Sequence, residues 1–135
     1  ITHNIVRHRP CAYSQESTRY CNYSKDKFGG EIVCIKPVNM DENTFAYRTW
    51  KKALEYAETA YFDLLDEGLS PEVARAVLPN SLKTDLVMTT NIAEWLHFIK
   101  LRGSEAAHPQ IKRLVNLLLI GLKLDIPDMF EDISL

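Results

Sequence analysis

The sequence predicts an α+β protein in which short β-strands pack with several long α-helices. Apolar residues recur every three or four positions over 45–65 and 111–122, a spacing typical of amphipathic helices. Two short runs, 31–36 and 86–90, are rich in β-branched residues and favour extended structure. Because 135 residues with 46% hydrophobic and 25% charged side chains suit one globular domain, we expect a single domain over 1–135.

The first third of the chain is expected to be strand and loop. Residues 1–6 have the apolar spacing of a helix end, and residues 13–20, rich in Ser, Thr and Tyr, favour an extended segment. Polar residues and glycines predict a loop over 22–30. Residues 31–36 are predicted to form a short strand that Pro37 ends, because proline has no N–H to donate to a sheet.

A long helix is predicted to begin after Asp41 and to end at Gly68, a residue suited to a left-handed C-terminal cap. Ser70 and Pro71 supply a cap and a first turn for a shorter helix. That helix is expected to end at Leu78, because the proline that follows disfavours helical angles at the residue before it.

Two further helices are predicted in the last third of the chain. Asn91 has the position of an N-cap, and Glu94, three residues later, completes the pattern of a capping box. Gly103 is expected to end this helix. A proline in the first turn then predicts a last helix over 109–125.

Charge and cysteine content exclude several classes of partner. A net charge of −2 gives no general attraction to nucleic acid or anionic membrane, and no run of apolar residues is long enough for a membrane span. Cys11, Cys21 and Cys34 are odd in number and form no Cys-x-x-Cys pair, which argues against a disulfide framework. His3 and His8 combine with the first two cysteines in no common zinc-ligand spacing. We therefore expect a cytoplasmic protein without a metal, a nucleic-acid partner or a membrane.

The most informative stretch is 7–20. Residues 1–30 carry five Lys or Arg against two acids, so the positive charge is concentrated here. In an extended segment Arg7 and Arg9 share one face and His8 the other. Guanidinium groups suit phosphate, and hydroxyls follow at Ser14, Ser17 and Thr18. The stretch predicts an anion site, most simply for a nucleotide, although taken alone it also fits a basic surface loop.

The same stretch resembles the signature of the flavin-dependent thymidylate synthases, the ThyX family: Arg-His-Arg, seven residues, and then Ser17. The likeness continues over 16–20, returns over 73–79, and then includes Asn91, Leu101, Arg102 and Ala107. Family members carry a substantial segment ahead of this signature, and the chain begins with an isoleucine rather than methionine. The resemblance therefore implies the C-terminal portion of a longer catalytic domain that lacks its N-terminal segment.

The resemblance implies a methyltransferase that converts dUMP to dTMP by reductive methylation. In such enzymes methylenetetrahydrofolate supplies the carbon, NADPH reduces FAD, and FAD carries the hydride. The resemblance also implies a homotetramer in which the signature loop meets flavin and nucleotide at a subunit interface.

Site residues follow from the same resemblance. Those implied for FAD are Arg7, His8, Arg9, Gln15, Asn91 and His97. Those implied for dUMP are Asn4, Ser17, Thr18, Arg19, Arg75 and Arg102. Arg102 is also implied to be catalytic, because a guanidinium beside the base stabilises negative charge as it develops on the ring. The sequence departs from the family pattern at Gln15, His97 and Ala106, where many or some relatives carry an acid, an amide and a histidine.

The residues alone leave alternatives open. Arg75 lies in an apolar helix segment and equally fits pairing with Glu72 or Asp85. Arg102 ends a helix and fits a contact with its C-terminal carbonyls, while Asn91 fits a helix cap. Two other functions remain: a nucleotide-binding fragment without turnover, and a helical interaction protein in which the Arg-His-Arg triplet is incidental.

Overall fold

The structure, a computed structural model, describes residues 1–25 and 28–135. Asp26 and Lys27, which belong to the loop predicted over 22–30 and to the basic N-terminal stretch, lie outside the described residues. The fold is α+β, as the sequence predicts: helices accompany a small two-stranded sheet. The chain divides into two compact units, each with its own apolar core: residues 1–14 with 86–135, and residues 15–85.

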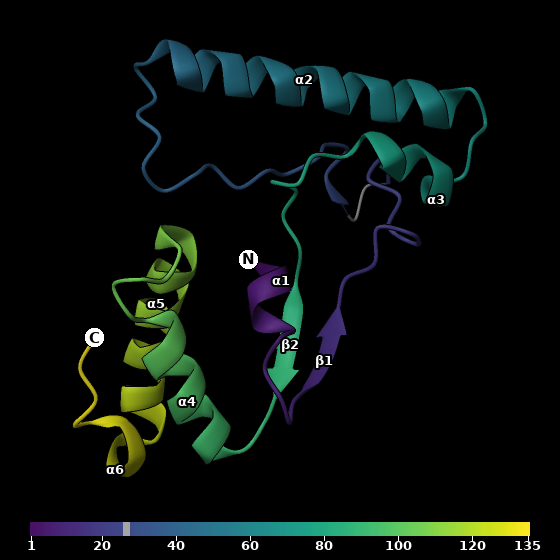
Figure 1. The fold of residues 1–135 in the computed structure, drawn as a ribbon. Coiled ribbons are helices and arrows are strands. Elements are labelled where there is room, and N and C mark those ends of the chain that lie inside the picture. The colour runs from purple at the N-terminus through teal and green to yellow at the C-terminus, as the bar shows by residue number, and fades with distance from the viewer. Residues whose placement is uncertain (26–27) are drawn as a thin grey trace. The chain divides into compact units, whose positions relative to one another are not determined.

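The first unit contains the sheet and three of the helices that follow it. Strands β1 and β2 pair side by side and run in opposite directions (Figure 1). The elements are α1 (Thr2–Ile5), β1 (Ala12–Gln15, whose last residue begins the second unit), β2 (Leu86–Thr89), α4 (Ile92–Arg102), α5 (Pro109–Asp125) and α6 (Pro127–Phe130).

Helices α4 and α5 form most of the core of this unit. Ile111, Val115 and Leu119 repeat every four residues on one face of α5 and are all buried, which is the stripe expected of an amphipathic helix. They pack in one cluster with Phe98 and Ile99 of α4. The cluster is completed by Ile5 of α1 and by Phe130 of α6, which anchors a short helix that the sequence analysis did not predict.

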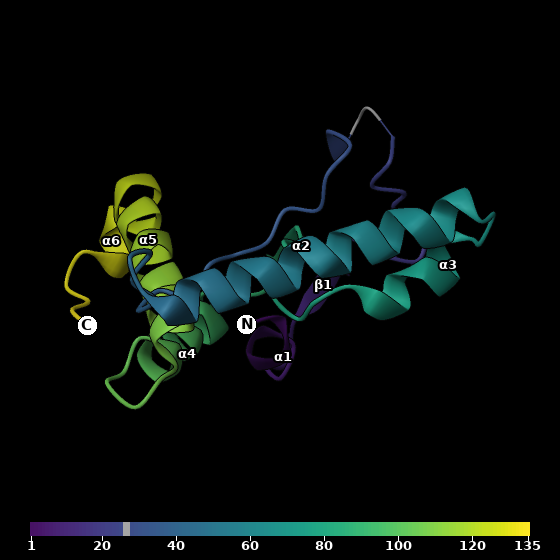
Figure 2. The ribbon, with the colours of Figure 1, turned by 90° about the horizontal axis from the view of Figure 1, so that it is seen from above.

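The second unit is built on α2 (Phe45–Asp66), with α3 (Pro71–Ala74) and a 3₁₀ turn (Arg75–Val77) packed alongside it (Figure 2). The Thr44 hydroxyl caps α2 by accepting from the Tyr47 N–H at 3.2 Å. Gly68 has a φ of +87°, so the predicted left-handed stop after this helix is confirmed. The predicted short helix from Pro71 is also confirmed, and it ends before Leu78.

Tyr61 fastens the segment before α2 to the helix. Its ring is fully buried, and its hydroxyl donates to the Cys21 carbonyl at 3.3 Å and accepts from the Tyr23 N–H at 3.4 Å. Tyr23 and Ala74 are the other buried residues of this core. One side chain of α2 therefore holds both a main-chain donor and a main-chain acceptor of the loop.

The strand predicted over 31–36 is wrong. Only Cys34 forms a bridge, opposite Leu82, although the flanking main chain also bonds the segment 81–83. Val33 and Ile35 bond the segment 81–83, and the next residue on that edge, Pro37, has no N–H to extend the pairing. The Ile32 N–H donates to the Glu58 carboxylate at 2.8 Å, and the segment remains an isolated bridge.

The remaining predictions are mostly confirmed. The helix end within 1–6, the extended run within 86–90, and the helices that begin at Ile92 and Pro109 are all present. The extended segment predicted over 13–20 stops at Gln15, because the chain then turns and the Tyr20 N–H donates to the Ser17 carbonyl at 3.1 Å. Within the described residues, no helix combines the length and the apolar content that crossing a bilayer requires.

Candidate functional site

An open pocket in the first unit gathers most of the residues predicted for FAD. Its volume is about 440 Å³, and its lining residues are Arg7, His8, Arg9, Glu94, His97, Leu101 and Arg102. Three guanidinium groups and one carboxylate line it, so the pocket carries net positive charge. Such a surface suits an anionic ligand that can accept several charge-assisted hydrogen bonds.

The Arg-His-Arg triplet supplies one wall of this pocket. Arg7 and Arg9 are exposed whereas His8 is buried, with 4% of its surface accessible, although the triplet lies in a turn rather than in the extended segment assumed for two opposite faces. The His8 ring packs edge-on against Phe98, with ring centroids 4.8 Å apart, and lies 5.6 Å from the His97 ring. The apolar core thus fixes the histidine and leaves both arginines in solvent.

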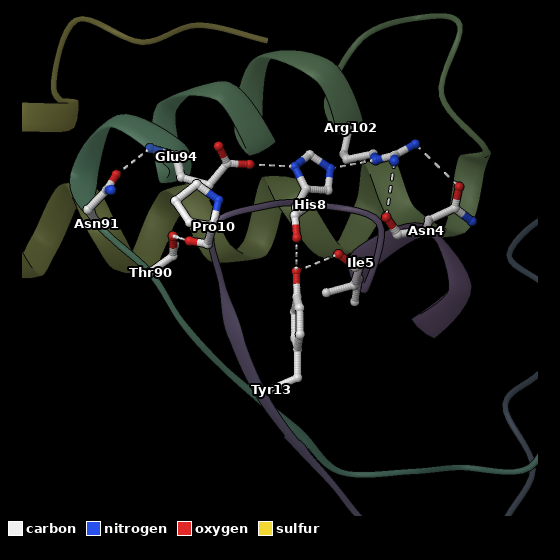
Figure 3. Close-up of polar contacts among 9 residues, drawn as sticks. All are labelled: Asn4, Ile5, His8, Pro10, Tyr13, Thr90, Asn91, Glu94 and Arg102. Carbon is white, nitrogen blue, oxygen red and sulfur yellow. Dashed lines mark hydrogen bonds and ion pairs between the residues drawn. The ribbon is translucent and has the colours of Figure 1, made fainter.

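Both ring nitrogens of His8 are engaged (Figure 3). Nδ1 lies 2.9 Å from Oε1 of Glu94, and Nε2 accepts from Nε of Arg102 at 3.0 Å. Arg102 therefore contacts the signature loop, and the alternative in which it serves only the carbonyls that end α4 does not describe its contacts.

Asn4 holds the other side of the Arg102 guanidinium. One terminal nitrogen donates to the Asn4 side-chain oxygen at 3.3 Å and the other to its main-chain carbonyl at 3.0 Å (Figure 3). Two residues predicted for dUMP, one in α1 and one at the end of α4, are thus brought together. Of the five N–H groups of a guanidinium, three are used in these bonds and with His8.

Tyr13 and Thr90 brace the loop that carries the triplet. The Tyr13 hydroxyl donates to the carbonyls of Ile5 at 2.8 Å and His8 at 3.0 Å, and burial raises the pKa of this tyrosine to about 12. The Thr90 hydroxyl donates to the Pro10 carbonyl at 2.9 Å. Strand β1 and the residue that follows β2 thereby position the loop.

Glu94 has a role that the sequence analysis missed. Asn91 caps α4 as predicted, because its side-chain oxygen accepts from the Glu94 N–H at 2.9 Å. The reciprocal half of the capping box does not form, since the Glu94 carboxylate binds His8. The two residues lie 86 positions apart, and no spacing in the sequence signals such a contact. Asn91 itself is not among the residues that line the pocket.

A second group of predicted residues lies in the second unit. Arg75 donates to the Thr18 hydroxyl at 3.3 Å and to the Glu72 main-chain carbonyl at 3.2 Å. Arg19 forms an ion pair with the Glu72 carboxylate at 3.0 Å, with both side chains about half exposed. The Ser17 hydroxyl accepts from the Arg19 N–H at 3.3 Å. Residues predicted to bind the dUMP phosphate are therefore neighbours.

The carboxylates suggested as partners of Arg75 are used elsewhere. That of Glu72 pairs with Arg19, and that of Asp85 pairs with Lys83 at 2.8 Å. Gln15, predicted for FAD, donates to the Thr84 hydroxyl at 3.4 Å and is not among the pocket residues. The predicted dUMP residues are divided between the units: Asn4 and Arg102 in the first, and Ser17, Thr18, Arg19 and Arg75 in the second.

His8, Glu94 and His97 lie close enough together to be considered as metal ligands. One potential ligand atom of each residue lies within 4.8 Å of those of the other two. The hydrogen bonds of His8 with Glu94 and Arg102 argue against a metal. Arg102 is always protonated and donates to Nε2 of His8, so the single proton of a neutral ring resides on Nδ1, which then has no lone pair for a metal. The pocket is suited to an anion.

An α+β fold with two groups of arginines, one in each unit, has the chemistry of a protein that binds phosphorylated ligands. The sequence profile of the thymidylate synthase complementing protein family matches residues 1–128. The chain belongs to this family.

Individual relatives agree with the family match. The chain is 34% identical to a flavin-dependent thymidylate synthase of Geobacter sulfurreducens, over 97% of the chain and 55% of that protein. It is 32% identical to the flavin-dependent thymidylate synthase of Pyrococcus furiosus, over 84% of the chain and 46% of that protein. The corresponding protein of Mycolicibacterium gilvum is 34% identical, over 99% and 57%. The chain thus spans about half the length of the curated relatives it matches.

Proposed function

We propose that this chain contributes FAD-binding and dUMP-binding residues to a flavin-dependent thymidylate synthase, which converts dUMP to dTMP. The observation that carries the proposal is the pocket, because it joins Arg7, His8, Arg9 and His97, predicted for FAD, to Arg102, predicted for dUMP. Family membership and the names of the relatives support the same activity.

Arginines of the pocket are suited to bind and orient an anionic cofactor. Arg7 and Arg9 are exposed and can donate to phosphate oxygens, while the buried His8 keeps their loop in place. Arg102 presents N–H groups that can hydrogen-bond a pyrimidine carbonyl and stabilise negative charge on the ring. When bound, FAD supplies the hydride chemistry. In this proposal NADPH is the reductant and methylenetetrahydrofolate the carbon donor.

The phosphate of dUMP is assigned to the second unit. Thr18, Arg19 and Arg75 combine a hydroxyl with two guanidinium groups, a donor set that matches phosphate geometry. The Ser17 hydroxyl adds a contact to the same turn. Arg19 pairs with Glu72 through Nε alone, so its terminal N–H groups can donate to the phosphate in competition with that carboxylate.

We also propose that the protein assembles as a homotetramer and acts in the cytoplasm. Apolar side chains exposed on α5, among them Leu117 at 64% and Leu124 at 78% exposure, are the kind of surface that subunit contacts bury.

Ligand binding by the purified chain tests the proposal. We expect a visible absorption spectrum from a chromophore that mass spectrometry identifies as FAD. Titration should show dUMP binding that weakens about tenfold or more on Arg75→Met, since a charge-assisted contact is lost. Arg113→Gln, which removes an exposed arginine of α5 outside both groups, should leave the affinity unchanged.

Other outcomes would point elsewhere. Binding of dUMP without FAD uptake would favour the nucleotide-binding fragment, an alternative supported by the half-length match. A colourless chain that binds neither added FAD nor dUMP would contradict the proposal and favour the interaction protein.

A further inference from the structure

We propose that Glu94 is a positioning residue for Arg102 and acts through the tautomer of His8. The three side chains form one line of hydrogen bonds, from the Glu94 carboxylate through the imidazole to the guanidinium (Figure 3). The importance of Arg102 for dUMP rests on the proposed function, whereas the tautomer follows from the contacts alone.

The N–H group of Arg102 determines which atom donates and which accepts in both hydrogen bonds of His8. A guanidinium has only N–H donors and stays protonated in proteins, so Nε2 of His8 must offer its lone pair to Arg102. The proton of the neutral ring is then on Nδ1, which donates to Oε1 of Glu94 at 2.9 Å. A carboxylate is the acceptor-only partner that this tautomer needs.

Without the carboxylate, the Nδ1–H group loses its acceptor and only the contact with Arg102 still favours this tautomer, so the population of the other tautomer increases. A proton on Nε2 would point at the N–H of Arg102, and the hydrogen bond between the imidazole and the guanidinium would be lost. Both partners are largely shielded from solvent in the wall of the pocket, because the side chain of His8 is 2% exposed and that of Glu94 is 11% exposed. Water therefore cannot readily replace either partner, and a wrong proton position costs more than it would at the surface.

The line of hydrogen bonds determines which donors Arg102 offers to the pocket. His8 holds Nε, and Asn4 holds one N–H on each terminal nitrogen. Two N–H groups then remain, for which no described residue provides an acceptor. Because the guanidinium is planar and held on two sides, these donors have a fixed direction before a ligand binds, which favours affinity.

The test combines a proton measurement with a binding measurement on the full chain. Long-range ¹H–¹⁵N spectra of the histidine rings should show the Nδ1–H form of His8 in the unmodified chain and a shift toward the Nε2–H form in Glu94→Ala. The affinity for dUMP should fall about tenfold in that variant, the loss expected when a charged hydrogen bond is released. Glu94→Gln should keep both the Nδ1–H form of His8 and the dUMP affinity of the unmodified chain, because its amide oxygen still accepts from Nδ1–H.

Two controls separate positioning from general damage. Glu105→Gln removes an exposed carboxylate that follows α4 and pairs with Lys112, and it should change neither readout. In an Arg102→Met background, Glu94→Ala should have no further effect on dUMP affinity, since the residue acts only through the arginine.

Several outcomes would overturn the proposal: an Nε2–H form of His8 in the unmodified chain, or full dUMP affinity in a folded Glu94→Ala. If the alanine variant does not fold, the tautomer of the unmodified chain and the Glu94→Gln variant decide. An unmodified chain that has the Nδ1–H form but binds no dUMP would refute the proposed function and leave the hydrogen-bond geometry intact.

Discussion

Tyr23 and Tyr61 pack together in the second unit, with ring centroids 5.8 Å apart, yet their hydroxyls are in opposite situations. That of Tyr61 bonds two main-chain groups. That of Tyr23 is buried, and no partner for it exists among the described residues. An unpaired buried hydroxyl lowers stability, because it gives up its bonds to water and gains none.

We therefore expect Tyr23→Phe to raise the free energy of unfolding by about 1 kcal/mol, the lower end of the penalty for an unsatisfied buried group. Tyr61→Phe should lower it by about 1 kcal/mol or more, since it leaves both main-chain partners unpaired. Urea unfolding of the two variants measures both effects. Equal destabilisation by the two changes would contradict this account of the Tyr23 hydroxyl.

At this scale the sequence predicts local chemistry and misses distant partners. Arg7 and Arg9 are exposed and His8 is buried, the pattern expected for the triplet, although the chain turns here and is not extended. The partner of His8 could not be predicted, because Glu94 has an obvious local use in a capping box. Only the fold shows that its carboxylate binds a residue 86 positions away.

The helices show how local signals set element boundaries. Caps and prolines define the starts of α4 and α5, where Asn91 and Pro109 occupy the expected positions. The predicted strand at 31–36 is reduced to a bridge at Cys34, because Pro37 has no N–H with which to extend the pairing. Helix α6 has four residues, too few to show a helical repeat, so tertiary burial of Phe130 rather than pattern accounts for it.

Two glycines at helix positions should respond in opposite ways to alanine. A Cβ at Gly103, which ends α4, would lie 2.7 Å from the Ile99 carbonyl and 2.4 Å from Leu135 Cδ2. Gly103→Ala should therefore lower the free energy of unfolding by about 1–3 kcal/mol through overpacking.

Gly121, inside α5, is the matched control. A Cβ there meets nothing within 4 Å, so Gly121→Ala should raise stability by about 1 kcal/mol through helix propensity. Thermal unfolding of both variants provides the comparison. A Gly103→Ala variant as stable as the unmodified chain would show that the end of α4 relaxes freely.

For the whole molecule, the division into two units was the feature that the sequence patterns predicted least well. The chain leaves the first unit at Ser14 and returns to it at Leu86. Periodicity and capping describe neighbours in sequence, so they carry no information on which distant segments share a core. Family resemblance contributed more, because its motifs in 7–20 and 73–79 and at Arg102 include residues of both units.

Tyr13 in the first unit is partly buried and Tyr23 in the second is buried, so the folded chain should lose stability in alkali. Burial raises the pKa of Tyr13 and of Tyr23 from 10.0 to about 12. The folded chain therefore binds these protons more tightly than the unfolded chain. The resulting stability is fully present below pH 10, the unfolded value, and is lost as the pH rises toward 12.

Urea unfolding at a series of pH values between about 9 and about 12 measures this loss. Tyr13→Phe and Tyr23→Phe should each flatten the decline by removing one titrating group. A free energy of unfolding that stays constant over this range would contradict the assignment of buried, protonated tyrosines.

The ion pair between Arg19 and Glu72 bears on how the proposed phosphate site works before its ligand arrives. The Glu72 carboxylate binds Arg19 as a phosphate would. It already restrains the long Arg19 side chain, which would otherwise sample many rotamers. A phosphate would then approach a guanidinium that already faces an anion rather than a free cation. We therefore expect the proposed site to favour ligands with more charge than a single carboxylate, because these compete better for Arg19.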